Sequence, residues 1–444
     1  MEFEAPEKEV TIKIEEPFEV TMRISTRPKE FEGRIFFKYH LFRAKKVNPF
    51  FFSSADPWCH AKFCADVLWF CPLDCPHCYK EWKIRRSGRI EKEIIHSIKK
   101  KCSELGKPLV APLALGLVVN LPDAIRSINT PTLIRINAMS DVCIREGVKF
   151  LRHVLMAAEE NPNVYLIIMT KTPLQKEPGV MKEMAELAAE KRVFLHVSLP
   201  TFADEILSII EPVAFSAKAR INLISTAISM GIPTAVRIYP LIPGLNDSAE
   251  HFRMMMDYLE KHAAIPDHVV VGYIALPTPE KKYLPSDLEI YFMRLRKYLD
   301  FIVELAVKYG FAVNRELLEG WKKLFEAARA VDIDGKSHCI SGSGVVEYQG
   351  KNVETKYYIM MPKEEYRMKK YEELKNELLR LSEELAKKIS FGICGEPNIN
   401  LKMLQGSPDC SGWLGLSFMR RVPDEKIPEW MKKSLLYKLL TQQA

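Results

Sequence analysis

Short apolar runs alternate with helical segments from residue 66 to residue 280, and this alternation restricts the fold more than any other feature of the chain. Each run is rich in β-branched residues, and the stretch after it repeats its apolar residues with helical spacing. The predicted strands are Asp66–Phe70, Thr132–Asn137, Val164–Thr170, Val193–Leu199, Thr234–Tyr239 and Val269–Ala275. The predicted helices between them are 84–104, 145–160, 178–190, 214–230 and 248–262.

The predicted strands are apolar at nearly every position, as parallel strands are when both faces of their sheet are buried. Six β/α units of this kind predict an α/β fold, a partial (β/α)6 barrel of the TIM type. An open doubly wound sheet is the alternative, because spacing alone does not separate the two architectures.

Three regions are predicted along the chain. Residues 1–65 form an N-terminal extension with strand-like runs at Val10–Ile14 and Arg34–Phe42, and residues 66–280 form the core barrel. Residues 281–444 form a mostly helical domain that contains cysteines, with helices at 286–308, 315–329 and 363–389. The last helix carries an apolar stripe that spans only about two heptads, which favours core packing over a coiled coil. The stripe consists of Tyr371, Leu374, Leu378, Leu381 and Leu385.

Five of the ten cysteines lie between residues 59 and 78, and three of them form the loop Cys71-Pro-Leu-Asp-Cys75-Pro-His-Cys78. Thiolates are soft ligands that suit iron–sulfur clusters or zinc. A structural zinc site normally has four protein ligands, and His77 is expected to point away from the cysteines. The loop therefore offers three ligands and leaves a fourth position open for a substrate or cofactor.

The Cys-x3-Cys-x2-Cys pattern, placed near the first strand of a β/α series, resembles the radical S-adenosylmethionine (radical SAM) superfamily. The resemblance implies an enzyme with a [4Fe-4S] cluster on Cys71, Cys75 and Cys78, whose fourth iron binds S-adenosylmethionine. Reductive cleavage of that cofactor then gives a 5′-deoxyadenosyl radical that acts on a substrate. Tyr79 matches the adenine contact of the family, with simple packing as its alternative. A zinc or redox loop is the alternative for the three cysteines.

Several stretches of the core are similar to the spore photoproduct lyase branch of this superfamily. They are Arg135-Ile-Asn-Ala-Met-Ser140-Asp141, Thr170-Lys171-Thr172, Val197-Ser198-Leu199, Glu211-Pro212, Ala219-Arg220 and Val236-Arg237-Ile238. The resemblance implies that S-adenosylmethionine is bound by Ser140, Asp141, Lys171, Ser198 and Arg237. These residues lie at or near strand ends, which form the active face of barrel folds. Each could instead be a surface pair or a helix cap, and Ser140 and Asp141 stand where N-caps are favoured.

Two groups of cysteines raise further hypotheses. The spore photoproduct lyases have a hydrogen-donating cysteine directly before the Ser-Asp pair, where this chain has Met139. Cys143 could take that role, although it is expected inside the next helix, where a packed thiol is the alternative.

A second iron–sulfur cluster could form on Cys339, Cys394 and Cys410 with Cys59 or Cys64, and buried free thiols are the alternative for these residues.

The net charge of +7 and the basic segment 83–107 support a competing hypothesis, a non-catalytic zinc or iron–sulfur metalloprotein that binds nucleic acid.

The apolar stretch Val110–Val119 is too short for a membrane span, and the acidic start does not resemble a signal peptide. A cytoplasmic protein with no membrane partner is expected. The expected partners are S-adenosylmethionine, a low-potential electron donor of the ferredoxin or flavodoxin type, and a substrate that could be nucleic acid, polypeptide or small molecule.

Overall fold

The computed structural model describes residues 113–274, apart from 212–213 and 243–244, and a set of shorter stretches. These stretches are 8–13, 19–31, 34–45, 49–52, 61, 63–69, 71, 73, 75, 77, 276–279, 339–348, 351–360, 364–381, 389–393, 422–427 and 432.

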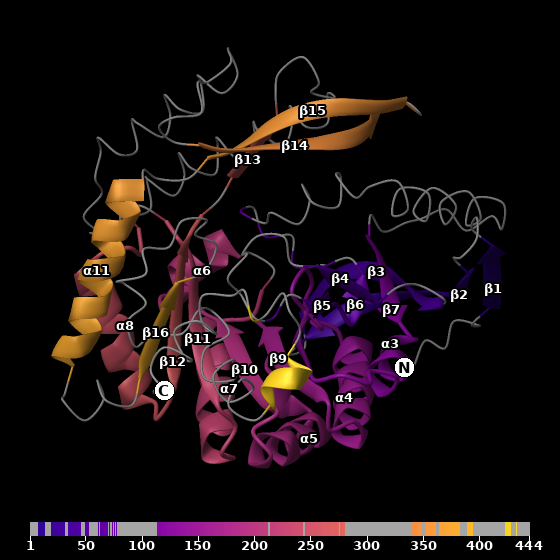
Figure 1. Ribbon diagram of the computed structural model, residues 1–444, viewed down its shortest axis with the longest axis horizontal. Helices are drawn as coiled ribbons and strands as arrows, with labels where there is room; N and C mark the ends of the chain where they lie inside the picture. The colour runs from indigo at the N-terminus through magenta and orange to yellow at the C-terminus, as the bar shows by residue number, and fades with distance from the viewer. Residues whose placement is uncertain are drawn as a thin grey trace.

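The core of the molecule is an eight-stranded sheet with the order β16-β12-β11-β10-β9-β8-β5-β4 (Figure 1). All neighbouring strands in it are parallel except β4, which runs antiparallel to β5 at one edge. The strands are β4 (Phe50–Phe52), β5 (Phe63–Ala65), β8 (Thr132–Ile136), β9 (Val164–Thr170), β10 (Val193–Ser198), β11 (Thr234–Leu241), β12 (His268–Tyr273) and β16 (Ser390–Ile393). The predicted α/β fold, a partial barrel of the TIM type, is confirmed.

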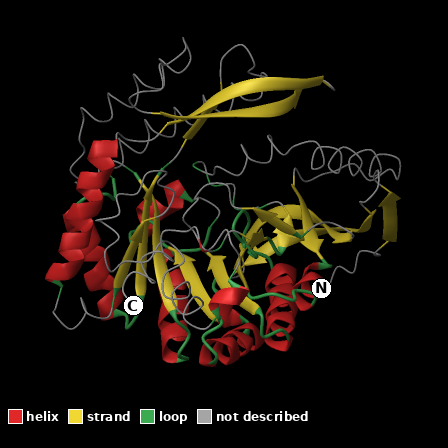
Figure 2. Cartoon of the chain, viewed as in Figure 1, coloured by secondary structure: helices red, strands yellow, loops and turns green. Residues whose placement is uncertain are grey.

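Helices alternate with the parallel strands. They are α3 (Leu121–Arg126), α4 (Arg145–Glu160), the 3-10 helix η1 (Leu174–Lys176), α5 (Pro178–Ala189), α6 (Asp204–Ile210), α7 (Ala217–Ser229) and α8 (Ala249–Lys261). Helices α4, α5 and α7 form a layer along the sheet, whereas α6 lies near the upper ends of β11 and β12 in the view shared by Figure 1 and Figure 2. The predictions for 145–160, 178–190, 214–230 and 248–262 are confirmed within a few residues, and 84–104 lies outside the described residues. The hydroxyls of Ser216 and Ser248 cap α7 and α8 by accepting from the backbone N–H three residues on.

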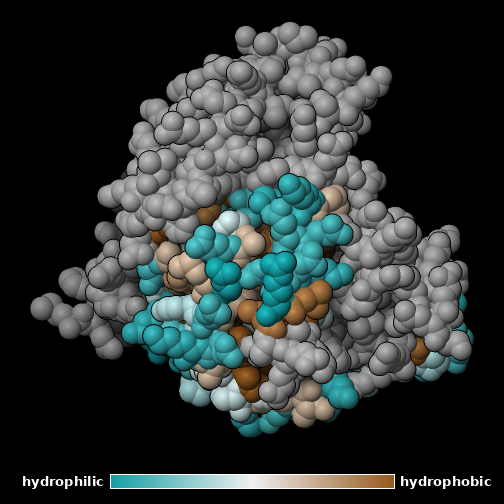
Figure 3. All heavy atoms as spheres, turned by 90° about the vertical axis from the view of Figure 1, so that its left-hand side faces the viewer, coloured by the Kyte–Doolittle hydropathy of each residue, from teal (hydrophilic) through white to brown (hydrophobic). Residues whose placement is uncertain are grey.

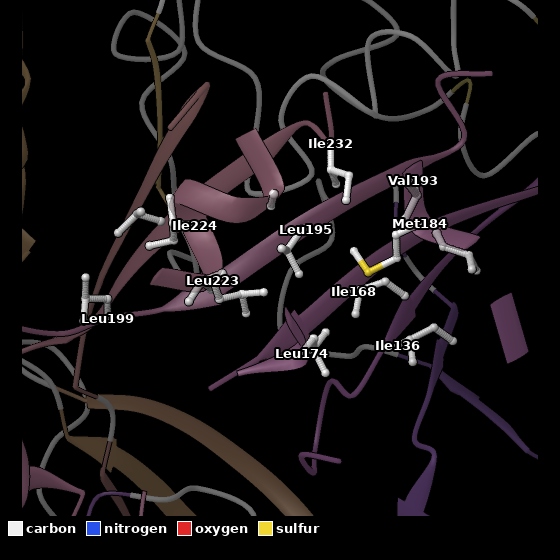
Figure 4. Packing of buried hydrophobic residues seen from close by; sticks show 14 of the residues in the cluster. Ile136, Ile168, Leu174, Met184, Val193, Leu195, Leu199, Leu223, Ile224 and Ile232 are labelled. Atoms are coloured by element: carbon white, nitrogen blue, oxygen red, sulfur yellow. The ribbon is translucent and has the colours of Figure 1, made fainter. Parts of the chain in front are cut away.

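The main hydrophobic core fills the space between this sheet and its helices (Figure 4). Alternate strand residues such as Ile136, Ile168 and Leu195 meet helix residues such as Met184 and Leu223, and all five are buried. Burying a side chain of this size stabilises the fold by roughly 1.5–3 kcal/mol. The helix layer therefore fixes the sheet whose strand ends carry the polar residues predicted to bind a cofactor.

The opposite, inner face of the sheet carries a second cluster. Leu133, Phe194 and Ala235 belong to it, and Val422 and Ile427 pack on them from the far end of the chain. These last two residues flank the 3-10 helix η3 (Asp424–Lys426), so a C-terminal segment covers part of the inner face.

The prediction that Asp66–Phe70 is the first parallel strand is wrong. The first parallel strand is β5, and it is too short, at three residues, for a periodic pattern to reveal it. Within the predicted range, β6 (Leu68–Trp69) pairs antiparallel with β7 (Leu113–Val118). Both belong to a five-stranded sheet that also contains β1 (Lys8–Lys13), β2 (Glu19–Phe31) and β3 (Arg34–Lys45). The two strand-like runs of the N-terminal extension are thereby confirmed, and β2 and β7 were not predicted.

The C-terminal third contributes directly to the core. Strand β16 extends the parallel sheet beside β12, and α11 (Glu364–Arg380) lies beside α8 in Figure 1. Tyr371, Leu374 and Leu378 are buried in the main core and Leu381 packs against it, which confirms the core-packing stripe for these four residues. Leu385 and the predicted helices 286–308 and 315–329 lie outside the described residues.

Three strands form a separate antiparallel sheet with the order β13-β15-β14, which lies away from the core sheet in Figure 1. They are β13 (Leu276–Pro279), β14 (Cys339–Tyr348) and β15 (Lys351–Met360), and this hairpin was not predicted. The described surface on the α8 and α11 side is mainly hydrophilic (Figure 3). Among the described helices, none combines the length and the apolar character needed to span a bilayer.

Candidate metal and cofactor site

Cys71 and Cys75 lie half-buried in the loop that follows β6. Both pack against one small cluster formed by Leu73, Cys143 and Phe215. Two of the three predicted cluster ligands therefore share one apolar support at the end of the sheet. Cys78 and Tyr79 lie outside the described residues.

Lys171, directly after β9, is the residue that ties the cysteine loop to the sheet. Its Nζ lies 3.4 Å from Cys75 Sγ and 2.6 Å from Glu211 Oε1. Burial opposes the charged amine, but the Cys75 and Glu211 side chains outweigh it and raise the pKa of Lys171 above its ordinary value. A cation at this distance favours the thiolate form of a cysteine, which is the form that binds metal.

Glu211 is fully buried and joins two cations. Its second oxygen, Oε2, lies 2.5 Å from Arg220 Nη2. Burial would raise the pKa of Glu211, but Arg220, Lys171 and His77 lower it to about 2, so the carboxylate is charged. Arg220 in turn donates from Nη1 to the Ser198 carbonyl at 2.8 Å. A continuous charged network thus runs from Cys75 to the end of β10.

His77 lies beside this network, and the expectation that it points away from the cysteines is wrong. Its Nε2 is 3.9 Å from Glu211 Oε1, and the ligand atoms of Cys75, His77 and Glu211 all lie within 4.8 Å of one another. Burial and the charge of Lys171 lower the pKa of His77 to about 4, so the ring is neutral near pH 7. Because both Glu211 oxygens are ion-paired with Lys171 and Arg220, the triad is poorly suited to zinc.

Asp141 fixes the backbone of Lys171. Its Oδ2 accepts a hydrogen bond from the Lys171 N–H at 2.6 Å, and its Oδ1 accepts from the hydroxyls of Thr170 at 3.0 Å and Thr172 at 2.6 Å. Burial raises the pKa of Asp141, although these hydrogen bonds oppose that effect. The N-cap of α4 is Ile144, without a side-chain cap, so neither Asp141 nor Ser140 caps this helix.

Ser140 and Asn137, at the end of β8, offer polar atoms to a ligand. Both residues are buried, and neither Ser140 Oγ nor Asn137 Nδ2 has a hydrogen-bond partner within the described part of the chain. A buried polar atom without a partner is destabilising, so a polar ligand such as S-adenosylmethionine fits this place. Asn137 was not predicted. The only signal in the sequence was its position at a strand end, and its φ of 61° is one that asparagine tolerates better than most residues.

Ser198 and Arg237 are brought together as neighbours on adjacent strands. They are Cα partners in the register of β10 and β11. The Ser198 carbonyl accepts from Arg220, while the Arg237 guanidinium lies 5.8 Å from the centre of the Tyr239 ring. Ser140, Asp141, Lys171 and Ser198 therefore lie at or just after the carboxyl ends of β8, β9 and β10, and Arg237 lies within β11 opposite Ser198.

The remaining cysteines lie in different environments. Cys143 precedes α4, so the expectation that it lies inside the helix is wrong; it is buried and its Sγ is 3.4 Å from the Asp141 carbonyl. Cys64 is buried in β5, and Cys339 is the first residue of β14. Cys59, Cys394 and Cys410 lie outside the described residues.

Comparison with known proteins gives one family match. Residues 69–259 match the model of the radical SAM superfamily, and no curated protein sequence matches the chain. A solved spore photoproduct lyase complexed with dinucleoside spore photoproduct is 11% identical, with 80% of each chain covered and a TM-score of 0.47. A variant of that lyase with bound AdoMet and dinucleoside spore photoproduct is 11% identical, with 80% of this chain and 81% of the other covered and a TM-score of 0.46. The match to the family model and the cysteine loop agree: this chain carries a radical SAM domain over residues 69–259.

Proposed function

We propose that the protein is a radical SAM enzyme in which Cys71, Cys75 and Cys78 hold a [4Fe-4S] cluster that binds S-adenosylmethionine. The observation that carries this proposal is the contact of Cys75 Sγ with the charged Lys171 at the carboxyl ends of the parallel strands. When bound, such a cluster supplies one electron to S-adenosylmethionine, which splits into methionine and a 5′-deoxyadenosyl radical.

The charged network has a defined task in this proposal. Asp141 holds the Lys171 backbone, and Glu211 and Arg220 hold the Lys171 ammonium beside Cys75. A hydrogen bond to a ligating sulfur raises the reduction potential of an iron–sulfur cluster, because it stabilises the added negative charge. Lys171 is therefore proposed to act on the cluster ligand, in addition to its predicted role in binding the cofactor.

The cofactor is proposed to bind along the strand ends, at Ser140, Asp141, Ser198 and Arg237, with Tyr79 against the adenine. Asn137 joins this group because it is close in sequence to Ser140 and its buried Nδ2 has no hydrogen-bond partner in the described part of the chain, although its Oδ1 accepts from the Val67 N–H. Asp141 has both carboxylate oxygens engaged, so we assign it a positioning role rather than a direct contact.

Several finer proposals follow from the family and the sequence. The electron donor is a low-potential protein of the ferredoxin or flavodoxin type, and the cytoplasm is the proposed location. A second cluster on Cys339, Cys394 and Cys410 stays a prediction, with Cys59 favoured over Cys64 as a further ligand because Cys64 is buried within a strand. A hydrogen-donor role for Cys143 requires its thiol to leave the Asp141 carbonyl.

Metal analysis tests the proposal. Protein reconstituted without oxygen should bind about four irons in the core cluster, and replacement of Cys71, Cys75 and Cys78 by alanine should abolish them. Cys102→Ala, outside the loop, is the matched control and should keep the iron. Zinc in place of iron in protein purified without oxygen would contradict the proposal and support the competing metalloprotein. Iron that remains in the triple variant would establish the second cluster.

A further inference from the structure

Three nitrogen-bearing side chains share the inner face of the sheet. Arg135 on β8, His196 on β10 and Arg237 on β11 each stand two residues after a member of the inner apolar cluster: Leu133, Phe194 and Ala235. Residues two apart in a strand point to the same face, so all three project to the side opposite the main helix layer. Their exposed fractions are 7%, 1% and 4%. We call these three residues the inner-face donor patch.

The contact between Arg237 and His196 determines where the imidazole proton lies. Arg237 Nη1 is 3.5 Å from His196 Nδ1. A guanidinium can only donate, so Nδ1 must accept and the ring proton must be on Nε2. Burial, together with the charges of Arg237, His268 and Arg135, holds the pKa of His196 well below its ordinary value, which keeps the ring neutral.

His196 Nε2 is thus a buried N–H donor, and it has no hydrogen-bond partner among the residues that the structure describes. Buried donors in native proteins nearly always have an acceptor, and leaving one unmade destabilises the fold. The charges of Arg237 and Arg135 both act on this ring, so the local potential is positive. An acceptor that carries negative charge fits this place better than a neutral one.

We propose that the inner-face donor patch binds an anionic oxygen group, phosphate or carboxylate, that belongs to the substrate. The inference rests on the proposed function, because that function brings the substrate to the carboxyl ends of the strands, where Arg135 and His196 lie one and two residues inside β8 and β10. Within the patch, Arg237 contacts His196 and is the register partner of Ser198, so it would contact both the substrate anion and the cofactor.

Anion binding to the reconstituted protein tests this proposal without turnover. Inorganic phosphate or acetate replaces chloride at constant ionic strength, and the dissociation constant is measured by calorimetry and by the shift in Tm. One of the two anions should bind and raise the Tm. His196→Leu should weaken that binding roughly tenfold or more, and His196→Gln, which keeps a donor, should restore part of it. His153→Leu, an exposed histidine on α4, is the matched control and should bind as the wild type does.

The outcomes separate the sources of the anion. Tighter binding of phosphate indicates a phosphate ester, and tighter binding of acetate indicates a carboxylate. The proposal is overturned if neither anion binds, if His196→Leu binds them unchanged, or if S-adenosylmethionine displaces them, since the patch would then belong to the cofactor. Should His196→Leu not fold, Arg135→Gln gives the same comparison. The binding measurement does not depend on the formation of 5′-deoxyadenosine. If the proposed function fails, anion binding by the patch can therefore still be judged separately.

Discussion

Lys171 is the residue on which the geometry of the site depends most. Its ammonium lies between Cys75 Sγ and Glu211 Oε1, and Asp141 holds its backbone. The sequence placed Lys171 at a strand end, but its partners Cys75 and Glu211 are 96 and 40 positions away. The roles of Glu211 and Arg220 could not be predicted for the same reason, since an isolated glutamate or arginine is read from sequence as a surface charge.

Lys171→Met tests the network at this scale. The change leaves Glu211 buried with only Arg220 as a close cationic partner, so we expect a loss of about 3 kcal/mol in the free energy of unfolding of the metal-free protein. Urea unfolding measures it. Lys182→Met removes an exposed ion pair with Glu186 on α5 and should change stability by less than about 1 kcal/mol. Equal effects of the two substitutions would contradict the account of the network.

At the scale of elements, long periodic segments were predictable and short ones were not. Helices α4, α5, α7 and α8 and strands β8 to β12 lie within a few residues of the predicted ranges, because the helices repeat their apolar residues with a clear period and the strands are unbroken apolar runs. Strands β5 and β16 have three and four residues, which is too few for any period to appear. Their place in the sheet comes from pairing with β8 and β12, which no local pattern encodes.

At Gly147, near its start, α4 packs closely against Val142 and Leu68. A Cβ added at Gly147 would lie 2.7 Å from the Val142 carbonyl oxygen, next to the Asp141 loop, and 3.0 Å from Leu68. We therefore expect Gly147→Ala to destabilise the protein by about 1–3 kcal/mol.

Gly179→Ala on α5 is the matched control. Its Cβ would meet only the Arg152 side chain, whose end can move, and alanine favours a helix over glycine by roughly 0.5–1 kcal/mol. Thermal unfolding of both variants measures the difference. The close-approach explanation is rejected if Gly147→Ala is as stable as Gly179→Ala.

At the scale of the whole molecule, the C-terminal third is part of the core rather than an addition to it. Strand β16 closes the edge beside β12, and α11 buries Tyr371, Leu374 and Leu378 in the main core. Further toward the C-terminus, Val422 and Ile427 pack on the inner face of the sheet. The heptad stripe predicted the packing of α11, whereas nothing in the sequence indicated which helix it would meet.

Two leucines of α11 test this docking. Leu374 is fully buried, so Leu374→Ala should lower the free energy of unfolding by about 2–5 kcal/mol. Leu379, on the same helix, is 57% exposed, and Leu379→Ala should stay within about 0.5 kcal/mol of the wild type. Denaturant unfolding of both variants provides the measurement, and similar losses in the two would show that α11 does not dock through Leu374.

The formation of 5′-deoxyadenosine is the most direct test of the central claim. Protein reconstituted without oxygen, reduced with dithionite and given S-adenosylmethionine should release 5′-deoxyadenosine and methionine, detected by chromatography with mass spectrometry. Cys75→Ala should release neither, and Cys102→Ala should match the wild type. A protein with about four irons in a reducible cluster that forms no 5′-deoxyadenosine would contradict the account.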